Sequence, residues 1–560
     1  MPLAPRRPRR TTLPVVRLAA AGLPLAVLAV FFVLPVGGML ARGFVVDGAF
    51  DPGGVLQVLT RPRVHRVLGF TLFSAGAATV LAVLLGVPAA YALSRLRFPG
   101  VRLLRAVVVV PFVLPTVVVG VAFRQLFAPA GLLGGLGLEG TPAAIVLALV
   151  FFNIAVVVRT VGAQWEGLDP RREEAAAALG ARPSQVWWTV TLPALRPAIV
   201  SAASVVFLFC ATAFGVVLTL GGLRYSTVET EIYLLTTSFL DLQAAAALSL
   251  LQILAVVGLL LLAHRARAGE VGLARVRRPR RRPRRRDVPA LLVLTGVVAL
   301  VVTPVATLIG RSLRTSDGWG LDHYRALAAG PQDGGSNALR VPVTDAIENS
   351  LRIAVDATVI AIVLGLLVAL VTTRPAPPGG VARRVVSWVD GAFMLPLGVS
   401  AVTLGFGFLI TLDRPPLDLR SSALLVPIAQ AMVALPLVVR VLSPVLSSID
   451  DRQRQVAATL GAGPLRVIRD VDLALVWRPL LAAVGFAFAV SLGEFGATSF
   501  LSRADRPTLP VVIFQLISRP GLDNAAMAMA AAVVLGTLTV AVMALVELLQ
   551  RSRRSGGWIG

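Results

Sequence analysis

Long uncharged apolar stretches constrain the fold of this chain more than any other feature. Residues 18–40, 67–94 and 106–123 contain no charged side chain. A helix of about 17 to 25 residues crosses a hydrocarbon core of roughly 30 Å, so each stretch is long enough. Backbone groups in lipid must be bonded within the segment, and the alternating pattern of a membrane β-barrel is absent. The stretches therefore predict transmembrane α-helices.

The composition agrees with a chain that lies mostly within a membrane. Of its 560 residues, 56% are hydrophobic and only 15% are charged, against about 25% charged residues in soluble domains. We expect an all-α polytopic fold with about twelve transmembrane helices. The first apolar stretch is longer than the roughly 7–15 residues of a signal-peptide core, so we expect it to be retained. The predicted spans are 18–40, 67–94, 106–127, 143–163, 197–220, 244–264, 289–310, 350–373, 388–411, 421–442, 479–500 and 525–549.

Every basic residue is an arginine, and the arginines indicate the orientation. The net charge is +24, and lysine is absent. Cytoplasmic loops of membrane proteins are enriched in basic residues, so we expect the Arg- and Pro-rich segment 265–287 to be a cytoplasmic linker. Both termini then lie in the cytoplasm. This segment has no aromatic residues on which bases could stack, which argues against a nucleic-acid partner and favours the lipid bilayer.

The chain contains the same unit twice. The segment LGARPSQV (179–186) recurs as LGAGPLRV (460–467), at a numbering offset of 281 (460 − 179). The same offset carries the pair Phe-Gly at 214–215 onto the pair at 495–496. Two copies of equal topology are related by an axis along the membrane normal, with a pathway at their interface. We expect a basic N-terminus 1–17, a first six-helix domain 18–264, the linker 265–287, a second six-helix domain 288–550 and a cytoplasmic tail 551–560.

The cytoplasmic loop after the fourth span is long in both copies, at about 166–196 and 447–478. Long loops in compact proteins are usually functional. Pro170 suits the start of a helix, alanines follow from Ala175, and Gly180 suits the helix end. Such a helix and turn can enter a groove on another protein, because alanine permits close approach. The residues alone leave a second interpretation open, in which an amphipathic helix pair lies at the membrane interface.

These loops resemble the EAA loop of binding-protein-dependent ABC importer permeases. The matching residues are Glu174, Ala175, Ala176 and Gly180, followed by Leu192–Pro193, in the first copy, and Ala457, Ala458 and Gly461 in the second, where Gln455 replaces the glutamate and Ala474 replaces the proline. The resemblance implies two tandem type I ABC permease domains fused in one chain of a bacterial inner membrane. It also implies that each loop forms a coupling helix on one of two ATP-binding subunits, and that an extracytoplasmic binding protein delivers the solute.

The resemblance extends to the solute. The segment 218–252, with its Leu-Gly-Gly at 220–222 and Ile-Tyr at 232–233, is similar to thiamine permeases. The segment SLGEFGATSFL (491–501) resembles both thiamine and ferric-iron permeases. We expect a thiamine importer, with a ferric-iron importer as the alternative.

Four residues are candidates for the substrate path: Asn153, Phe214, Glu494 and Phe495. An ionisable group at membrane depth marks a functional site by default, and aromatic rings suit a cation such as thiamine. Helix packing is the alternative role for Asn153 and Glu494. Four acidic residues are expected in outside loops, where the binding protein could meet them: Glu229, Glu231, Asp505 and Asp523.

The chain cannot bind ATP through a P-loop, because that motif requires a lysine and the chain has none. ATP is therefore expected on a partner subunit, with no cofactor on this chain and no enzymatic activity of its own. The three histidines are scattered and the single cysteine, Cys210, cannot form a cysteine metal site. An ion-coupled secondary transporter with two parallel halves is the alternative from another class, but it leaves the paired loops unexplained.

Overall fold

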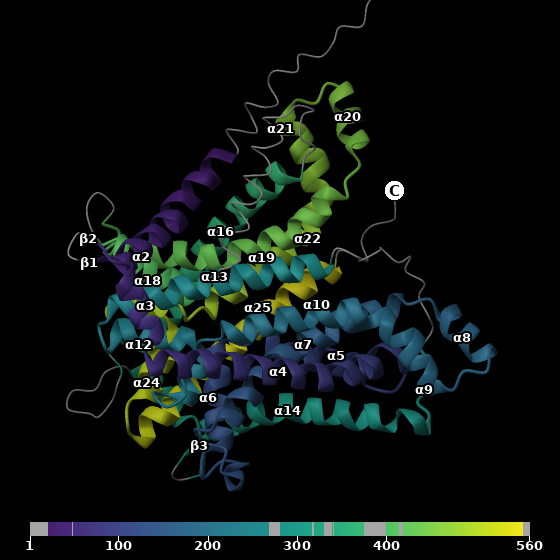
Figure 1. Ribbon diagram of the computed structural model, residues 1–560, viewed down its shortest axis with the longest axis horizontal. Helices are drawn as coiled ribbons and strands as arrows, with labels where there is room; N and C mark the ends of the chain where they lie inside the picture. Colours follow the sequence, from purple (N-terminus) through teal and green to yellow (C-terminus); the bar gives the residue numbers. More distant parts are fainter. Residues whose placement is uncertain are drawn as a thin grey trace, which may run out of the picture. The chain divides into compact units, whose positions relative to one another are not determined.

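The computed structural model describes residues 21–46, 49–267, 280–315, 318–329, 339, 341–373, 399–413 and 418–552 (Figure 1). Its contacts divide the chain into two compact units. The larger unit comprises Met39–Ser350 and Gly493–Val540, and the smaller unit comprises Met1–Gly38, Leu351–Leu492 and Ala541–Gly560. Part of the second sequence copy therefore packs with the first copy.

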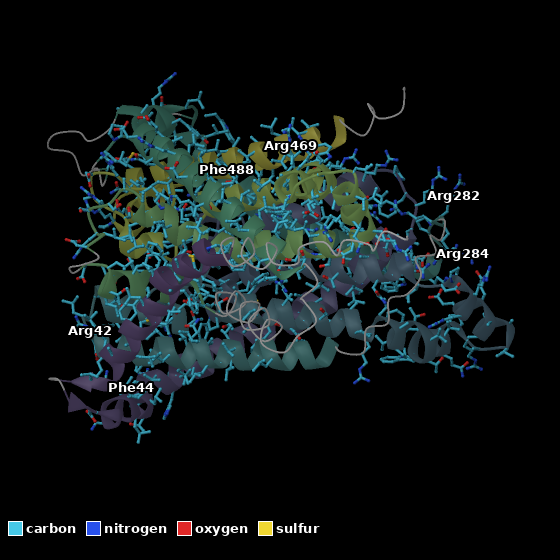
Figure 2. The ribbon with its side chains drawn as sticks, turned by 90° about the horizontal axis from the view of Figure 1, so that it is seen from above. Arg42, Phe44, Arg282, Arg284, Arg469 and Phe488 are labelled. Atoms are coloured by element: carbon cyan, nitrogen blue, oxygen red, sulfur yellow. The ribbon has the colours of Figure 1, made fainter. Side chains whose placement is uncertain are left out.

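The predicted domain boundaries follow the two sequence copies, whereas the two compact units each combine parts of the chain that are far apart in sequence. The predicted boundaries therefore stay a prediction. The predicted N-terminus 1–17, much of the linker 265–287 and most of the tail 551–560 lie outside the described residues. Figure 2 shows Arg42 and Phe44 at one end of the larger unit and Arg282 and Arg284, from the linker, at the opposite end.

The all-α polytopic fold is confirmed. Within the described ranges, ten helices are long and apolar enough to cross a membrane, or eleven if one bent pair is counted as a span. The predicted span 388–411 is described only from residue 399. Two short hairpins follow the first long helix of each copy: β1 (Val45–Val46) pairs with β2 (Ala49–Phe50), and β3 (Arg314–Thr315) pairs with β4 (Gly318–Trp319).

The helices of the two copies have closely similar order. The first copy holds α2 (Leu34–Phe44), α3 (Pro52–Thr60), α4 (Pro62–Arg95), α5 (Val101–Val109), α6 (Thr116–Phe127), α7 (Pro142–Gly167), α8 (Pro170–Ala178), α9 (Pro183–Val186), α10 (Leu192–Ala211), α11 (Gly215–Gly221), α12 (Val228–Thr237) and α13 (Leu242–Arg267). The second holds α14 (Val288–Ser312), α15 (Asp322–Ala329), α16 (Val343–Thr372), α18 (Ala401–Thr411), α19 (Leu425–Ser447), α20 (Asp451–Thr459), α21 (Pro464–Val467), α22 (Ala474–Leu492), α23 (Thr498–Leu501), α24 (Leu509–Ser518) and α25 (Leu522–Ser552).

Small residues bring the long helices together. In the larger unit α4 contacts α7, α10 and α14, which run beside it in Figure 1. Its buried face includes Ala75, Ala78 and Ala82, at helical spacing. Small side chains let helix backbones approach closely in a membrane, where van der Waals packing drives association.

The repeat predicted from the sequence recurs in the packing within each unit. In the larger unit, a Cβ added to Gly86 of α4 would lie 2.7 Å from Cγ1 of Val157 in α7. In the smaller unit, a Cβ added to Gly365 of α16 would lie 2.5 Å from Cγ1 of Val438 in α19. Val157 and Val438 are related by the same offset of 281 (438 − 157). Both positions therefore need glycine, because the facing valine occupies the space of a side chain.

Three predicted spans were wrong, because in the structure none of them is one continuous helix. The span 106–127 is broken before Thr116, and its two parts are bent by 104°, because Pro115 adopts an extended conformation with ψ 141° and disfavours helix in the preceding residue. The span 197–220 ends at Ala211, and the span 479–500 ends at Leu492. These two helices instead extend further toward the coupling loops, to Pro183 and Pro464.

Candidate functional site

The first coupling loop has the helix and turn that its sequence predicts. α8 is capped by Asp169, whose carboxylate accepts a hydrogen bond of 3.0 Å from the backbone N–H of Arg171. It ends at Ala178, and Gly180 two residues further on turns the chain with φ +86°. Two backbone hydrogen bonds close this end, from Ala181 N to Ala176 O at 3.1 Å and from Gly180 N to Ala177 O at 3.0 Å. This pattern is the Schellman helix end, which requires the left-handed conformation that glycine adopts most easily.

The second coupling loop repeats this geometry. α20 is capped by Asp450, whose carboxylate accepts 2.9 Å from Arg452 N. Gly461 has φ +87°, and its helix end is closed by Ala462 N to Ala457 O at 3.0 Å and Gly461 N to Ala458 O at 3.1 Å. The presence of Gln455 in place of the glutamate therefore leaves the backbone of the loop unchanged.

The helices of the two loops, α8 and α20, lie at the surface of their units. None of the residues of α8 or α20 is buried. Leu179 and Leu460, at their C-terminal ends, are 89% and 83% exposed. Glu174, Ala175, Gln455 and Ala458 are also exposed, whereas Ala176 and Ala457 are partly covered. Figure 1 shows α8 at the end of the larger unit opposite the β1–β2 hairpin.

Four aromatic rings form a circuit of contacts in the larger unit, which we call the aromatic quartet: Phe214, Tyr233, Phe495 and Phe514. The ring of Phe500 adds to it from outside the circuit, at 5.4 Å from Tyr233. The rings of Phe214 and Phe495 stack at 5.3 Å between centroids. Tyr233 lies 5.4 Å from Phe214, Phe514 lies 5.2 Å from Phe495, and the circuit closes with 6.4 Å between Tyr233 and Phe514. Phe214 and Phe495 stand where the chain leaves α10 and α22, so the helix breaks place them there.

The quartet follows the internal repeat. The offset of 281 relates Tyr233 to Phe514 (514 − 233) and Phe214 to Phe495 (495 − 214). Each copy therefore supplies two equivalent rings, and the rings meet where the copies meet. The candidates Phe214 and Phe495 are brought together. Tyr233 and Phe514 were missed as candidates, although the same offset applied to aromatic residues identifies them.

Glu494 holds the break before α23. Its side chain is buried, and its carboxylate accepts hydrogen bonds from Ala497 N at 2.8 Å, Thr498 N at 3.0 Å and Thr498 Oγ1 at 2.5 Å. A carboxylate at the N-terminus of a helix satisfies amides that have no partner within the helix. The carboxylate is thus turned toward its own chain, and a direct contact of Glu494 with substrate stays a prediction.

Asn153 lies in α7, on the side that contacts α10. Its side-chain amide donates to Leu149 O at 3.0 Å and to Cys210 Sγ at 3.3 Å, and the residue is 1% exposed. Its Oδ1 has no hydrogen-bond partner among the described residues. Neither of these hydrogen bonds reaches a quartet residue. Its role in the substrate path stays a prediction.

Two of the acidic residues expected in outside loops are buried instead. Glu229 and Glu231 lie in α12 and are 0% and 1% exposed. Both oxygens of Glu231 accept from Arg63, at 2.5 and 3.0 Å, and Glu229 accepts from Gln252. The prediction that these two meet a binding protein was wrong, because α12 folds back against α4 and α13. Asp505 and Asp523 are exposed as expected.

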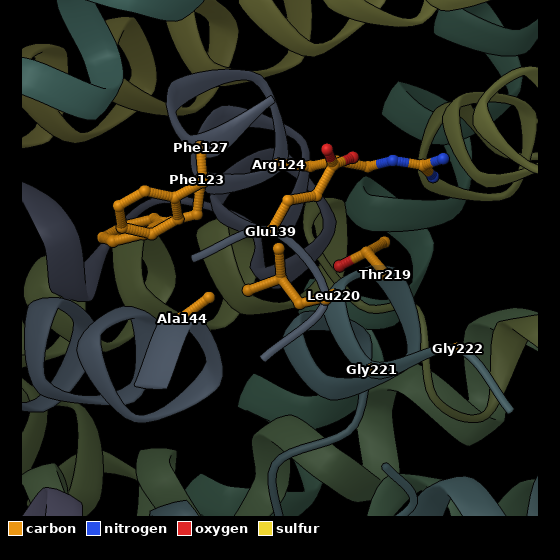
Figure 3. A pocket seen from close by; sticks show the side chains of 10 residues that line it. Phe123, Arg124, Phe127, Glu139, Ala144, Thr219, Leu220, Gly221 and Gly222 are labelled. Atoms are coloured by element: carbon orange, nitrogen blue, oxygen red, sulfur yellow. The ribbon is translucent and has the colours of Figure 1, made fainter. Parts of the chain in front are cut away.

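A separate pocket lies beside α11, between α6 and α7. Figure 3 shows the rings of Phe123 and Phe127 on one side, and Glu139 and Thr219 on others. Its volume of about 240 Å³ is smaller than the roughly 300–1,000 Å³ of sites that enclose a drug-sized ligand.

Comparison with known proteins agrees with the family resemblance that the repeated loops indicate. The family described as binding-protein-dependent transport system inner membrane component matches residues 78–268 and 361–555. The thiamine transport system permease protein ThiP of Brucella abortus is 29% identical over 98% of this chain and 98% of its own length. The molybdenum transport system permease protein ModB of Mycobacterium tuberculosis is 40% identical over 35% of this chain and 76% of its own.

One solved structure, a bacterial alginate ABC transporter in complex with an alginate-bound periplasmic protein, contains a chain that is 16% identical with a TM-score of 0.40, covering 47% of this chain and 100% of that one. The two family matches together span more than half of the sequence. This chain therefore belongs to the inner-membrane components of binding-protein-dependent transport systems, the permeases of ABC importers, and carries their domain twice in tandem.

Proposed function

We propose that this chain forms the translocation path of an importer for thiamine, driven by ATP hydrolysis in a separate subunit. The observation that carries the proposal is the pair of exposed coupling helices with the same capping and the same helix end. A fused relative with a thiamine-transport name aligns with nearly the whole chain, which supports thiamine as the solute.

Two ATP-binding subunits and an extracytoplasmic binding protein complete the proposed complex. The chain has no lysine, so the phosphate-binding lysine of a P-loop must come from another polypeptide. Two coupling helices give docking positions for two such subunits. Arg282 and Arg284 of the linker lie at the opposite end of the larger unit from Phe44. The excess of arginine on the cytoplasmic side of membrane proteins supports a cytoplasmic linker, and both termini then lie in the cytoplasm.

The aromatic quartet supplies a barrier on the path. Its four rings contact one another in a closed circuit, and such an apolar constriction excludes water and ions. Separation of the two copies would uncover the ring faces. Those faces attract an aromatic cation through stacking and cation–π interactions, which fits thiamine better than a hydrated anion.

The test is uptake into proteoliposomes that contain this chain with its ATP-binding subunit and its extracytoplasmic binding protein. We expect ATP-dependent uptake of thiamine, and none of ferric iron or molybdate. Uptake of iron or molybdate alone would reject thiamine and leave the importer assignment standing. Absence of ATP dependence for every solute would reject the proposed complex.

Replacement of Phe495 by alanine should open the barrier. The change removes the ring that contacts both Phe214 and Phe514, so the circuit loses two of its four contacts. We expect ATP-independent leak of a small ion from loaded proteoliposomes to rise at least several-fold, because a cavity replaces the ring.

Phe112→Ala is the matched control. Phe112 also contacts two rings, Phe152 at 6.3 Å and Phe209 at 6.4 Å, but lies outside the quartet. Equal leak in the two variants would show that the quartet is not the barrier.

A further inference from the structure

Each coupling helix is tied by a side chain to the start of the span that follows it. In the first loop Thr191 Oγ1 donates to Glu173 Oε1 at 3.1 Å, across 18 residues of sequence. The same carboxylate oxygen lies 3.6 Å from Nη2 of Arg95, at the end of α4. Glu173 therefore joins α8 to the end of α4 and to the turn that leads into α10.

The second loop has a tie in the same place, within the smaller unit. Arg454 Nε donates to Asp472 Oδ1 at 2.8 Å, again across 18 residues. Arg454 also donates to Asp451 at 2.6 Å and to the carbonyl of Leu446, at the end of α19, at 3.2 Å. Burial lowers the pKa of Arg454, but the hydrogen bonds to Asp472 and Asp451 outweigh burial and raise it above its ordinary value. The guanidinium is therefore charged at neutral pH.

The two ties are equivalent in position and different in chemistry. The repeat offset of 281 relates Glu173 to Arg454 (454 − 173) and Thr191 to Asp472 (472 − 191). The coupling helix thus contributes an acid in one copy and a base in the other, and the partner changes with it. The contact is retained where the residue types are not, which indicates that the contact itself is what both loops need.

Both ties end in a π-helical turn. Thr191 is the last residue of the turn Trp187–Thr191, and Asp472 lies in the turn Ile468–Leu473. Single π turns inside α-helices occur frequently at functional sites. Asp472 is fully buried and Arg454 is 13% exposed, so this tie is shielded from water and from screening by salt.

We propose that these two ties are struts, which make each coupling helix move as one body with the span that follows it. The proposal rests on the proposed docking of ATPase subunits on the two loops. A helix with no buried residue has little packing to stop it from pivoting at its flanking turns. The strut gives it a second point of attachment, so that a push on the coupling helix reaches α10 or α22. Glu173, Thr191, Arg454 and Asp472 are then positioning residues for transport.

The test first reverses the charge of Arg454. It then rebuilds the contact with the residue types that form it in the first loop. Arg454→Glu places a carboxylate against the buried Asp472, so we expect uptake per ATP hydrolysed to fall about tenfold. The double variant Arg454→Glu/Asp472→Thr recreates the acid and hydroxyl of the first loop and should recover uptake per ATP to within about threefold of the original. Arg469→Glu is the control, because this side chain is 86% exposed on the same loop; it should behave as the unchanged chain.

A milder variant covers the case in which Arg454→Glu fails to assemble. Thr191→Val keeps the shape of the side chain and removes the hydroxyl that donates to Glu173, so we expect a smaller fall in uptake per ATP with an intact complex on gel filtration. Unchanged uptake per ATP in both single variants, or no recovery in the double variant, would overturn the strut. Loss of ATP-driven uptake in the unchanged chain would instead overturn the proposed function.

Discussion

Replacement of Gly180 and Gly461 together by valine is expected to reduce ATP-driven uptake by roughly a hundredfold. Both glycines have a left-handed conformation, with φ +86° and +87°. That conformation costs a residue with a Cβ about 1–2 kcal/mol, and a β-branched residue is a severe outlier there. The Schellman ends of α8 and α20 should therefore open and displace the exposed helix ends on which we propose that the ATPase subunits dock.

The measurement is uptake together with ATP hydrolysis in the same proteoliposomes. Because the substitutions lie in loops outside the spans, we expect the chain to insert and the complex to hydrolyse ATP without moving solute. Gly463→Val is the matched control: it lies in the same loop as Gly461, has φ −68°, and a Cβ added there would meet no atom within 4 Å. Unchanged uptake in the Gly180/Gly461 double variant would contradict the assignment of these loops.

Replacement of Glu494 by leucine is expected to cause the largest loss of stability. The change removes the acceptor of three hydrogen bonds, from Ala497 N, Thr498 N and Thr498 Oγ1. Each buried donor left without a partner costs about 1–3 kcal/mol, so the break before α23 should lose its geometry. We expect the melting temperature of the detergent-solubilised complex to fall by several degrees. We also expect loss of uptake, because the next residue, Phe495, belongs to the quartet and would be displaced.

Thr498→Val distinguishes two roles for the Glu494 carboxylate, that of a helix cap and that of a substrate contact. The variant removes one donor and keeps the backbone bonds to Glu494, so its melting temperature should fall much less, by the roughly 1 kcal/mol of one hydrogen bond. If Glu494→Leu instead kept the melting temperature and weakened only the concentration dependence of thiamine uptake, the carboxylate would be a substrate contact and not a helix cap.

The coupling loops were predictable because their signals are local. Pro170 fixes a helix start, the alanines favour the helix, and Gly180 supplies the conformation of its end. The structure begins α8 at Pro170 and turns the chain at Gly180. The second loop lacks that proline and still folds alike, since Asp450 caps it as Asp169 caps the first.

The breaks at Phe214 and Glu494 could not be predicted from apolar character. A hydropathy pattern continues through both positions, because the residues that follow each break are apolar and buried within the larger unit. The same limitation misplaced Glu229 and Glu231. Acidic residues near a span end suggested an outside loop, whereas the fold pairs them with Gln252 and Arg63 inside the unit.

The sequence by itself determined the helical membrane fold, its duplication and the two coupling loops, because each depends on residues close together in the chain or on a fixed offset of 281 (461 − 180). Only the tertiary structure decided which side chains meet. In the quartet, Phe214 and Phe495 stack although each follows a helix break in a different copy. Each strut joins two residues that are 18 positions apart, on either side of a turn. Such contacts depend on how helices end and fold back, which is set by packing and buried hydrogen bonds rather than by periodicity.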